Sequence, residues 1–322
     1  MGYSNWDSSA SQALNVVRAT KPREEVFVET KIHPAMNPYG VMRRESRESA
    51  EHPDPVSIIT MLDGTGSMSH LPTDFAGSIL TRVMSLLVDQ GFVADPQMLL
   101  SMICDYSDRA VLQVGQFESG LEIDRDLTRL WLAGGGGGSG PCEEAYELGL
   151  YWVATRPVMD SFERHGKKGY LFIIGDEKPS PSVKKAGVRK IIGDNIDDDI
   201  PTELVLKMAQ EKFHVFFIHA NSGSYGSESG VFKRWQQLLG ANAIRMDNHF
   251  DFPELQGVIL GLMEGTIASL NDGAARLAAN GTKKDVIDRV VAALAPFAAS
   301  LSGDDVAVVP ASPRRRAAAT RL

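Results

Sequence analysis

The residues with the clearest chemical potential stand directly after the first long apolar run of the chain. They read Asp63-Gly64-Thr65-Gly66-Ser67, so a carboxylate is followed by hydroxyl groups two and four residues later. Carboxylate and hydroxyl oxygens are the ligands that a hard cation such as Mg²⁺ prefers in near-octahedral geometry. The two glycines permit the tight backbone that would point these three side chains at one ion. This segment therefore predicts a divalent-cation site.

A second acidic segment follows another apolar run, residues 169–174, and contributes Asp176. Runs of this kind are typical of strands that are buried on both faces of a parallel sheet. The carboxyl ends of parallel strands lie on the same rim of the sheet, where ligands bind. We therefore expect Asp63 and Asp176 to converge on that rim, although they are far apart in the sequence.

Strands and helices alternate along the middle of the chain, as the hydrophobic periodicity indicates. The predicted strands cover residues 56–62, 97–104, 109–117, 169–174, 213–219 and 243–246. The predicted helices cover residues 71–90, 118–132, 143–155, 202–212, 230–239 and 253–269. This order predicts an α/β fold with a mostly parallel central sheet, one antiparallel edge strand and helices on both faces.

The flanking segments differ in composition from this alternating region. Residues 1–22 predict a flexible arm or a short surface helix, residues 24–32 an edge strand, and residues 33–55 an extended connection. Residues 285–300 predict an amphipathic helix that Pro296 kinks or ends. The predicted organisation is an arm at 1–54, a main domain at 55–268, a helical extension at 269–302 and a disordered basic tail at 303–322.

The overall composition narrows the class of protein. The chain has 322 residues, of which 43% are hydrophobic, and its formal net charge of −8 disfavours a nucleic-acid binder. With only two cysteines, Cys104 and Cys142, a disulfide-rich scaffold is excluded. Residues 1–20 lack the apolar core of a signal peptide, and no apolar run is long enough to span a membrane. We expect a cytoplasmic protein that contacts neither membrane nor nucleic acid.

The cation-site pattern resembles the metal-ion-dependent adhesion site (MIDAS) of von Willebrand factor A (vWA) domains. Asp63-x-Thr65-x-Ser67 matches the family's Asp-x-Ser/Thr-x-Ser pattern, and Asp176 follows a later strand, as in the family. The resemblance covers residues 55–268 and implies a Rossmann-like vWA domain. It implies that Thr65 and Ser67 coordinate Mg²⁺ directly, while Asp63 and Asp176 bind it directly or through water. Mn²⁺ or Ca²⁺ would also suit these oxygen ligands.

The second loop of the expected site departs from the family pattern. The family supplies a Thr there, after a glycine pair and just before a helix, whereas this chain reads Gly-Gly-Ser139-Gly-Pro-Cys142-Glu143. Ser139 is the nearest hydroxyl and Glu143 is the nearest carboxylate, so either could be the additional metal ligand. A Glu would tighten cation binding, but it would make the ion a weaker acceptor for a partner's carboxylate.

Two further features do not predict additional sites. The five glycines at 134–138 are not followed by the Lys that a phosphate-binding P-loop requires. His249 stands near Asp247 and Asp251, but this spacing is not typical of a metal site. We interpret the glycine run as a loop on the rim of the sheet.

We interpret the chain as a non-catalytic, cation-dependent protein-interaction module, because no base or nucleophile accompanies the ligand set. The resemblance implies that a partner protein's carboxylate completes the Mg²⁺ shell. It also implies an adaptor or assembly factor that works beside a MoxR-type AAA+ ATPase, as in similar bacterial and phage proteins. One alternative is an Mg²⁺-dependent phosphohydrolase with Asp63 as nucleophile and Asp176 as metal ligand. Another is a structural protein in which helix 285–300 and the tails drive assembly.

Overall fold

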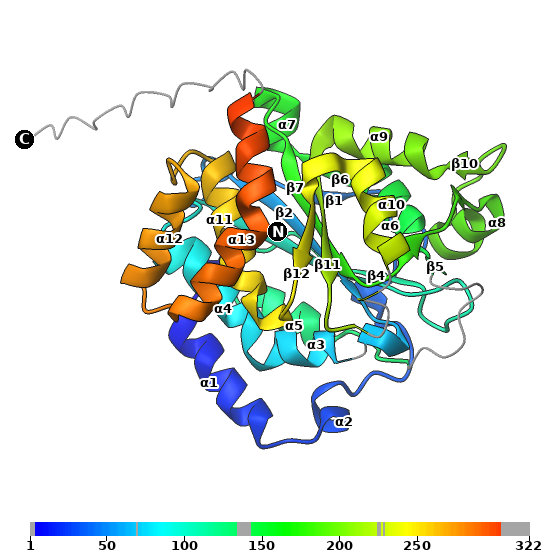
Figure 1. The fold of residues 1–322 in the computed structure, drawn as a ribbon. Helices are drawn as coiled ribbons and strands as arrows, with labels where there is room; N and C mark the ends of the chain where they lie inside the picture. Colours follow the sequence, from blue (N-terminus) through cyan, green and yellow to red (C-terminus); the bar gives the residue numbers. More distant parts are fainter. Residues whose placement is uncertain (1–3, 69, 134–142, 224–226, 228, 304–322) are drawn as a thin grey trace, which may run out of the picture.

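A six-stranded mixed sheet forms the centre of the fold (Figure 1). The structure is a computed structural model and describes residues 4–303 except residues 69, 134–142, 224–226 and 228. The strands of the sheet are, in spatial order, β12 (Ala243–Met246), β11 (Phe213–Ala220), β7 (Gly169–Gly175), β2 (Val56–Asp63), β3 (Pro96–Ile103) and β4 (Leu112–Val114). Neighbouring strands pair in parallel, except that β4 runs antiparallel to β3 at one edge. The predicted α/β class and the mostly parallel sheet are therefore confirmed.

Side chains of the central strand β2 alternate between two apolar cores, one on each face of the sheet. Ile58 and Leu62 belong to one core, whereas Ile59 and Met61 belong to the other. Every residue of β2 is buried. A strand that must be apolar on both faces reads as a continuous apolar run, which is why the sequence predicted it well.

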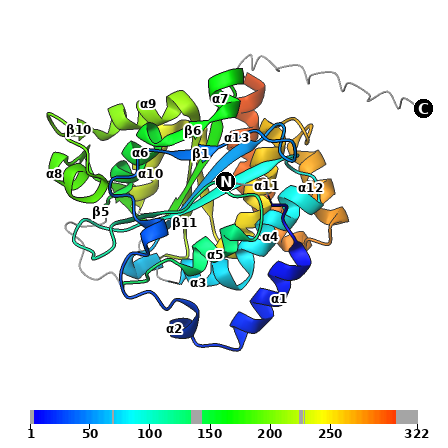
Figure 2. The same ribbon diagram turned by 180° about the vertical axis from the view of Figure 1, so that it is seen from behind.

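Helices cover both faces of the sheet, and the two groups lie on opposite sides in both views (Figures 1 and 2). One face carries α3 (Leu71–Asp74), η3 (Phe75–Ile79), α4 (Leu80–Met84), η4 (Ser85–Asp89), α5 (Glu122–Thr128), α11 (Phe252–Met263), α12 (Leu270–Ala279) and α13 (Lys284–Gly303). The other face carries α6 (Tyr146–Thr155), η5 (Val188–Ile192), α9 (Thr202–Lys212) and α10 (Ser229–Leu239). Segments η3, η4 and η5 are π-helical.

Shorter elements connect and flank these layers. In the part of the chain that the structure describes, three strand pairs lie outside the main sheet: β1 (Arg44–Ser46) with β6 (Pro157–Met159), β5 (Glu143–Glu144) with β8 (Lys178–Pro179), and β9 (Ser182–Val183) with β10 (Ile200–Pro201). The short helices are α2 (Arg23–Val26), η1 (Pro34–Met36), η2 (Gly66–Met68), α7 (Asp160–His165), α8 (Lys185–Gly187), η6 (Gly240–Asn242) and η7 (His249–Asp251). The N-terminal helix α1 (Ser8–Ala19) packs against η3 and α4, where Ser11 and Thr81 share a hydrogen bond of 2.5 Å.

The C-terminal helices α12 and α13 pack into the same core as the sheet. Leu277, Leu294 and Phe297 are buried, and the ring of Phe297 meets that of Phe216 on β11 edge to face, with centroids 5.4 Å apart. Pro296 lies inside α13 and does not end it. The region that the sequence set apart as an extension therefore contributes apolar surface to the main core.

The predicted edge strand at residues 24–32 is wrong. Helix α2 occupies the start of this segment, and no residue in it belongs to a strand. Pro22 precedes the helix in an extended conformation, and Glu24 and Glu25 lie in the first helical turn. Carboxylates there interact favourably with the positive end of the helix dipole. The prediction followed the alternation of apolar residues and did not take this helix signal into account.

Some helix ends also differ from the prediction. The helix expected at residues 253–269 ends at Met263 because Gly265 follows with a φ of 71°, the left-handed conformation that commonly ends a helix. A separate helix, α12, then begins at Leu270. The expected disordered tail falls almost wholly on residues 304–322, which lie outside the described residues.

One helical segment, Gly66–Asp89, is long and apolar enough in composition to cross a membrane. However, 61% of its most apolar window is buried inside the protein. The helix lies between the sheet and α1, so its apolar character is explained by packing on both sides.

Candidate metal centre

The four residues predicted from strand ends lie together at the carboxyl-end rim of β2 and β7. Asp63 is the last residue of β2, and Asp176 follows the last residue of β7, the strand beside it. The backbone N–H of Thr65 and its hydroxyl both donate to Asp63 Oδ1, at 2.9 and 2.6 Å. Ser67 Oγ lies 3.2 Å from Thr65 Oγ1 and donates to Asp176 Oδ1 at 2.8 Å. The four side chains thus form one continuous hydrogen-bonded chain.

The chain of side chains is closely enclosed by the protein. Asp63 and Asp176 are fully buried, and the Tyr146 hydroxyl donates a hydrogen bond to Asp63 Oδ2. A Cβ at Gly175 would overlap the Tyr146 hydroxyl and stand 2.9 Å from Asp63 Oδ2. A Cβ at Gly223 would overlap the carboxylate of Asp176. Both glycines therefore leave the space that the two aspartates occupy.

Two further buried carboxylates, Glu144 and Glu177, stand beside this chain. Burial and the nearby charges of Asp63 and Glu177 raise the pKa of Glu144 to about 11. Burial and the charges of Asp63 and Asp176 raise the pKa of Glu177 to about 7. We call Asp63, Thr65, Ser67, Asp176, Glu144 and Glu177 the rim centre.

Asp63 is likewise a buried carboxylate with a raised pKa. Burial raises its pKa to about 6, although the hydrogen bonds from Thr65 and Tyr146 act in the opposite direction. Within the described part of the chain, no Lys, Arg or His forms an ion pair with Asp63, Glu144 or Glu177. Buried carboxylates that lack a cationic partner favour protonation or a bound cation.

The donor set fits a hard divalent cation. Glu144 Oε2 is buried and has no hydrogen-bond partner among the described residues, so it has a free acceptor site. The remaining groups are carboxylate and hydroxyl oxygens, which Mg²⁺ prefers over nitrogen or sulfur. Hydroxyl oxygens can turn their lone pairs to an ion once their protons point elsewhere. The arrangement can therefore bind a cation.

The sequence-based candidates from the second loop have different outcomes. Glu143 is half-buried and lines a neighbouring pocket, whereas its neighbour Glu144 faces the rim centre. The two residues form strand β5, and successive side chains of a strand point to opposite sides. A helix was expected to start at residue 143, but α6 begins at Tyr146. Ser139 lies outside the described residues.

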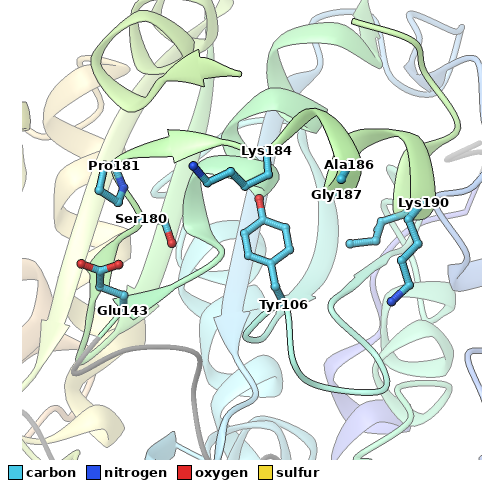
Figure 3. Close-up of a pocket in the computed structure, with 9 residues that line it drawn as sticks. Tyr106, Glu143, Ser180, Pro181, Lys184, Ala186, Gly187 and Lys190 are labelled. Carbon is cyan, nitrogen blue, oxygen red and sulfur yellow. The ribbon is translucent and has the colours of Figure 1, made fainter. Parts of the chain in front are cut away.

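The pocket beside Glu143 has a volume of 430 Å³. Figure 3 shows Tyr106 near its middle, with Glu143 on one side and Lys190 on the other. The Tyr106 hydroxyl donates to Glu147 Oε1 at 2.8 Å, and Lys184 forms an ion pair with Asp199 at 3.1 Å. Tyr106 and Lys184 therefore each have a partner of their own in or beside this pocket.

Comparison with known proteins assigns no family to this chain. No protein-family model and no curated protein matches the chain. Among solved structures, the chain is similar to the pilus adhesin SpaC from Lactobacillus rhamnosus GG in its open conformation, with a TM-score of 0.45 and 12% identity. A second structure of the same adhesin gives a TM-score of 0.42 and 13% identity. Each match covers 68% of this chain but only 31% of the adhesin, so the chain spans about a third of that protein.

Proposed function

We propose that this protein is a vWA-type interaction module that binds Mg²⁺ at the rim centre and holds a partner protein through the ion. The observation that carries the proposal is the convergence of Asp63, Thr65, Ser67 and Asp176 in one hydrogen-bonded chain. The resemblance of their spacing to a MIDAS motif supports the same interpretation. Glu144 Oε2, which has no hydrogen-bond partner among the described residues, adds a candidate metal ligand that the motif alone does not include.

Each residue has a distinct part in the proposed site. Thr65 and Ser67 would contribute hydroxyl oxygens, and Asp63 and Asp176 would contribute carboxylate oxygens, directly or through water. The bound ion supplies a positive charge that attracts a carboxylate of the partner. Tyr146 would orient Asp63 through its hydrogen bond, because partners of this kind fix the direction of a ligand's lone pairs.

The extra carboxylates would adjust the strength of the two interactions. Without the ion, the raised pKa of Glu144, about 11, keeps that carboxyl protonated near pH 7. A bound ion favours the ionised forms of Glu144 and Glu177, whose negative charge would strengthen cation binding. The same charge weakens the attraction between the ion and an incoming carboxylate. We therefore infer a module that keeps its ion firmly and binds its partner reversibly, as suits an adaptor beside a MoxR-type AAA+ ATPase in the cytoplasm.

The structure offers less support for the two alternatives. A phosphohydrolase would need an accessible Asp63 as nucleophile, but this carboxylate is fully buried and both of its oxygens accept hydrogen bonds. An assembly protein would need an apolar helix that is free to associate, but Leu294 and Phe297 of α13 are buried in the core of their own chain.

The proposal is tested by measuring Mg²⁺ affinity and partner capture with the same variants. Asp63→Asn keeps the size of the side chain and its acceptor for Thr65, but it removes the charge. We expect isothermal titration to show one Mg²⁺ per chain, lost in Asp63→Asn and kept in Asp199→Asn, an exposed loop control. Capture of host proteins should require both Mg²⁺ and Asp63. A partner list unchanged by chelator and by Asp63→Asn would contradict the proposed function.

A further inference from the structure

Two histidines and an aspartate form a second cluster at the carboxyl ends of the strands, outside the rim centre. His70 and Asp74 lie at the two ends of α3, which follows β2, and His249 begins η7, which follows β12. One ligand atom from each of the three residues lies within 4.8 Å of the others. His249 Nε2 is 2.8 Å from Asp74 Oδ2, and the two imidazole rings are 4.9 Å apart. Three groups able to ligate a metal therefore face one spot.

The first half of the cluster is held by local helical geometry. The backbone N–H of Asp74 donates to the carbonyl of His70 at 3.0 Å, so one helical turn places the two side chains on the same face. Directly after Asp74, the ring of Phe75 packs against Phe252 with centroids 5.5 Å apart. This buried contact joins the helix that carries Asp74 to the start of α11.

The second half of the cluster is held by a different set of contacts. Asn248 caps η7 by accepting from the backbone N–H of Phe250 at 3.1 Å. Asp251, at the other end of η7, binds the guanidinium of Arg289 on α13 through two hydrogen bonds of 2.6 and 2.8 Å. The segment that carries His249 is thus anchored by Asn248 and Arg289 in addition to its contacts with α3 and η3. Ligands fixed by separate contacts lose little freedom when an ion binds.

The orientation of His249 also suits metal binding. Its Nδ1 lies 3.4 Å from Ser222 Oγ, so the other ring nitrogen, Nε2, faces Asp74. A contact of this kind to one ring nitrogen fixes which nitrogen is left for a metal. His249 is 9% exposed, whereas His70 and Asp74 are half-buried, so an ion can reach the cluster from solvent.

We propose that His70, Asp74 and His249 bind a transition-metal dication, with Zn²⁺ as the best fit, at a site separate from the rim centre. Imidazole nitrogen with one carboxylate suits Zn²⁺, and three protein ligands leave a fourth position for water. With Zn–N and Zn–O distances of about 2.0–2.2 Å in tetrahedral geometry, Asp74 Oδ2 and His249 Nε2, which are 2.8 Å apart without the ion, would separate to admit it between them. The bound ion would tie η7 to α3, two segments that are far apart in the sequence.

The decisive measurement is a Zn²⁺ titration of the full, untagged chain against a chromophoric chelator, in excess Mg²⁺ so that the hard-cation ligands are occupied. We expect one Zn²⁺ per chain, and affinity at least about 100-fold weaker in His70→Ala and in His249→Ala. His165→Ala is the matched control, because this exposed histidine pairs with Glu48 elsewhere on the surface, and its affinity should equal that of wild type. Circular dichroism of each variant shows whether it is folded.

His70→Ala separates a metal site from an ordinary polar contact. The hydrogen bond between Asp74 and His249 does not involve His70, so this variant keeps it and should keep the fold. Co²⁺ in place of Zn²⁺ should give visible absorption bands that disappear in His70→Ala. Equal Zn²⁺ affinity in wild type and both histidine variants, or no binding at all, would overturn the proposal and leave the cluster as an Asp74–His249 hydrogen bond only.

Discussion

Two buried aspartates at opposite ends of the sheet have opposite electrostatic surroundings. Asp160 begins α7, ahead of β7, and is 3% exposed, while Asp63 ends β2 and is fully buried. Asp160 binds Arg47 at 2.5 Å and the backbone N–H of Glu48 at 3.1 Å. Although burial acts to raise its pKa, these hydrogen bonds and the charge of Arg47 hold the pKa below the usual value.

Asp63 has no such countercharge among the described residues, and burial raises its pKa to about 6. The protein therefore neutralises one buried aspartate with its own arginine and leaves the other beside further carboxylates. Neither side chain is much exposed, but Asp63 lies deeper in the protein than Asp160, so both its stronger burial and its missing countercharge raise its pKa. The missing countercharge at Asp63 favours an external cation at the rim centre, and variants of Asp63 and of Asp160 test this from the two ends of the sheet.

The largest expected effect is the change in the free energy of unfolding when each of these two aspartates is replaced in turn by asparagine. In metal-free buffer near pH 7, Asp160→Asn should lower the free energy of unfolding by about 1–3 kcal/mol, because it weakens a charge-assisted hydrogen bond to Arg47. Asp63→Asn should raise the free energy of unfolding by about 1 kcal/mol, because it removes a buried charge without a partner. Urea denaturation of both variants and of wild type measures the two values.

Added Mg²⁺ should make wild type more stable than Asp63→Asn, which reverses their order in metal-free buffer. It should leave the order of wild type and Asp160→Asn unchanged. At a concentration 100 times the dissociation constant, Mg²⁺ should stabilise wild type and Asp160→Asn by about 2.7 kcal/mol, and Asp63→Asn by almost nothing. A loss of stability in metal-free Asp63→Asn as large as that in Asp160→Asn would show that Asp63 is satisfied without a cation.

Gly175→Ala should have the next largest effect, because it disturbs the rim centre without changing any charge. The added Cβ would overlap the Tyr146 hydroxyl and press on Asp63 Oδ2, so we expect Mg²⁺ affinity to fall by at least about tenfold, or 1.4 kcal/mol. Gly77→Ala is the control, because its Cβ would have no neighbour within 4 Å. Isothermal titration of Mg²⁺ should distinguish the two, and equal affinity in both would mean that Asp63 does not contribute to the ion's shell.

Tyr146→Phe should have a smaller effect on the same binding. The variant removes the donor to Asp63 Oδ2 but keeps the ring, which packs edge to face against Phe217 and Trp235. Loss of such an orienting hydrogen bond commonly weakens metal binding by about tenfold. The same Mg²⁺ titration measures this change. Unaltered affinity together with unaltered stability would mean that Tyr146 is only a packing residue.

The parts of the molecule that the sequence predicted well are those with a strong local signal. The strand at residues 56–62 is apolar on both faces, so it reads as one continuous apolar run. Asp63 and Asp176 were paired by a topological rule, that parallel strands end on the same rim. Both predictions needed only the order of elements, and the structure brings the two residues to one place.

The parts that were missed depend on short elements or on distant contacts. Glu144 faces the rim centre because a two-residue strand, β5, precedes α6, and no periodicity is readable in two residues. His249 was judged against its sequence neighbours, whereas its partner Asp74 lies 175 residues earlier in the chain, and His70 stands beside Asp74 on the same helical turn. Tyr146 carried no signal of its own, since a tyrosine at the start of an apolar helix is equally typical of a core residue.

The smallest expected effect is the pH dependence of stability, to which Asp63 and Asp160 contribute with opposite signs. The pKa values of Asp63 and Glu177 are raised in the folded state, from 3.8 to about 6 and from 4.5 to about 7. Between these limits the folded protein binds more protons than the unfolded chain, so the free energy of unfolding falls as pH rises. Asp160 has the opposite sign, but its contribution is lost only as the pH falls below its ordinary value of 3.8.

In metal-free buffer we therefore expect stability to decrease between about pH 5 and 7, by on the order of 1 kcal/mol. Glu144, whose pKa is raised from 4.5 to about 11, adds to the same slope. Saturating Mg²⁺ should abolish or reverse this slope, because the ion replaces the protons and binds better as the carboxylates ionise. Asp63→Asn should flatten the slope, whereas Asp160→Asn should leave it unchanged. Urea denaturation at several pH values measures the slope. A slope that Mg²⁺ does not alter would mean that the raised pKa values reflect burial alone, with no role in holding a cation.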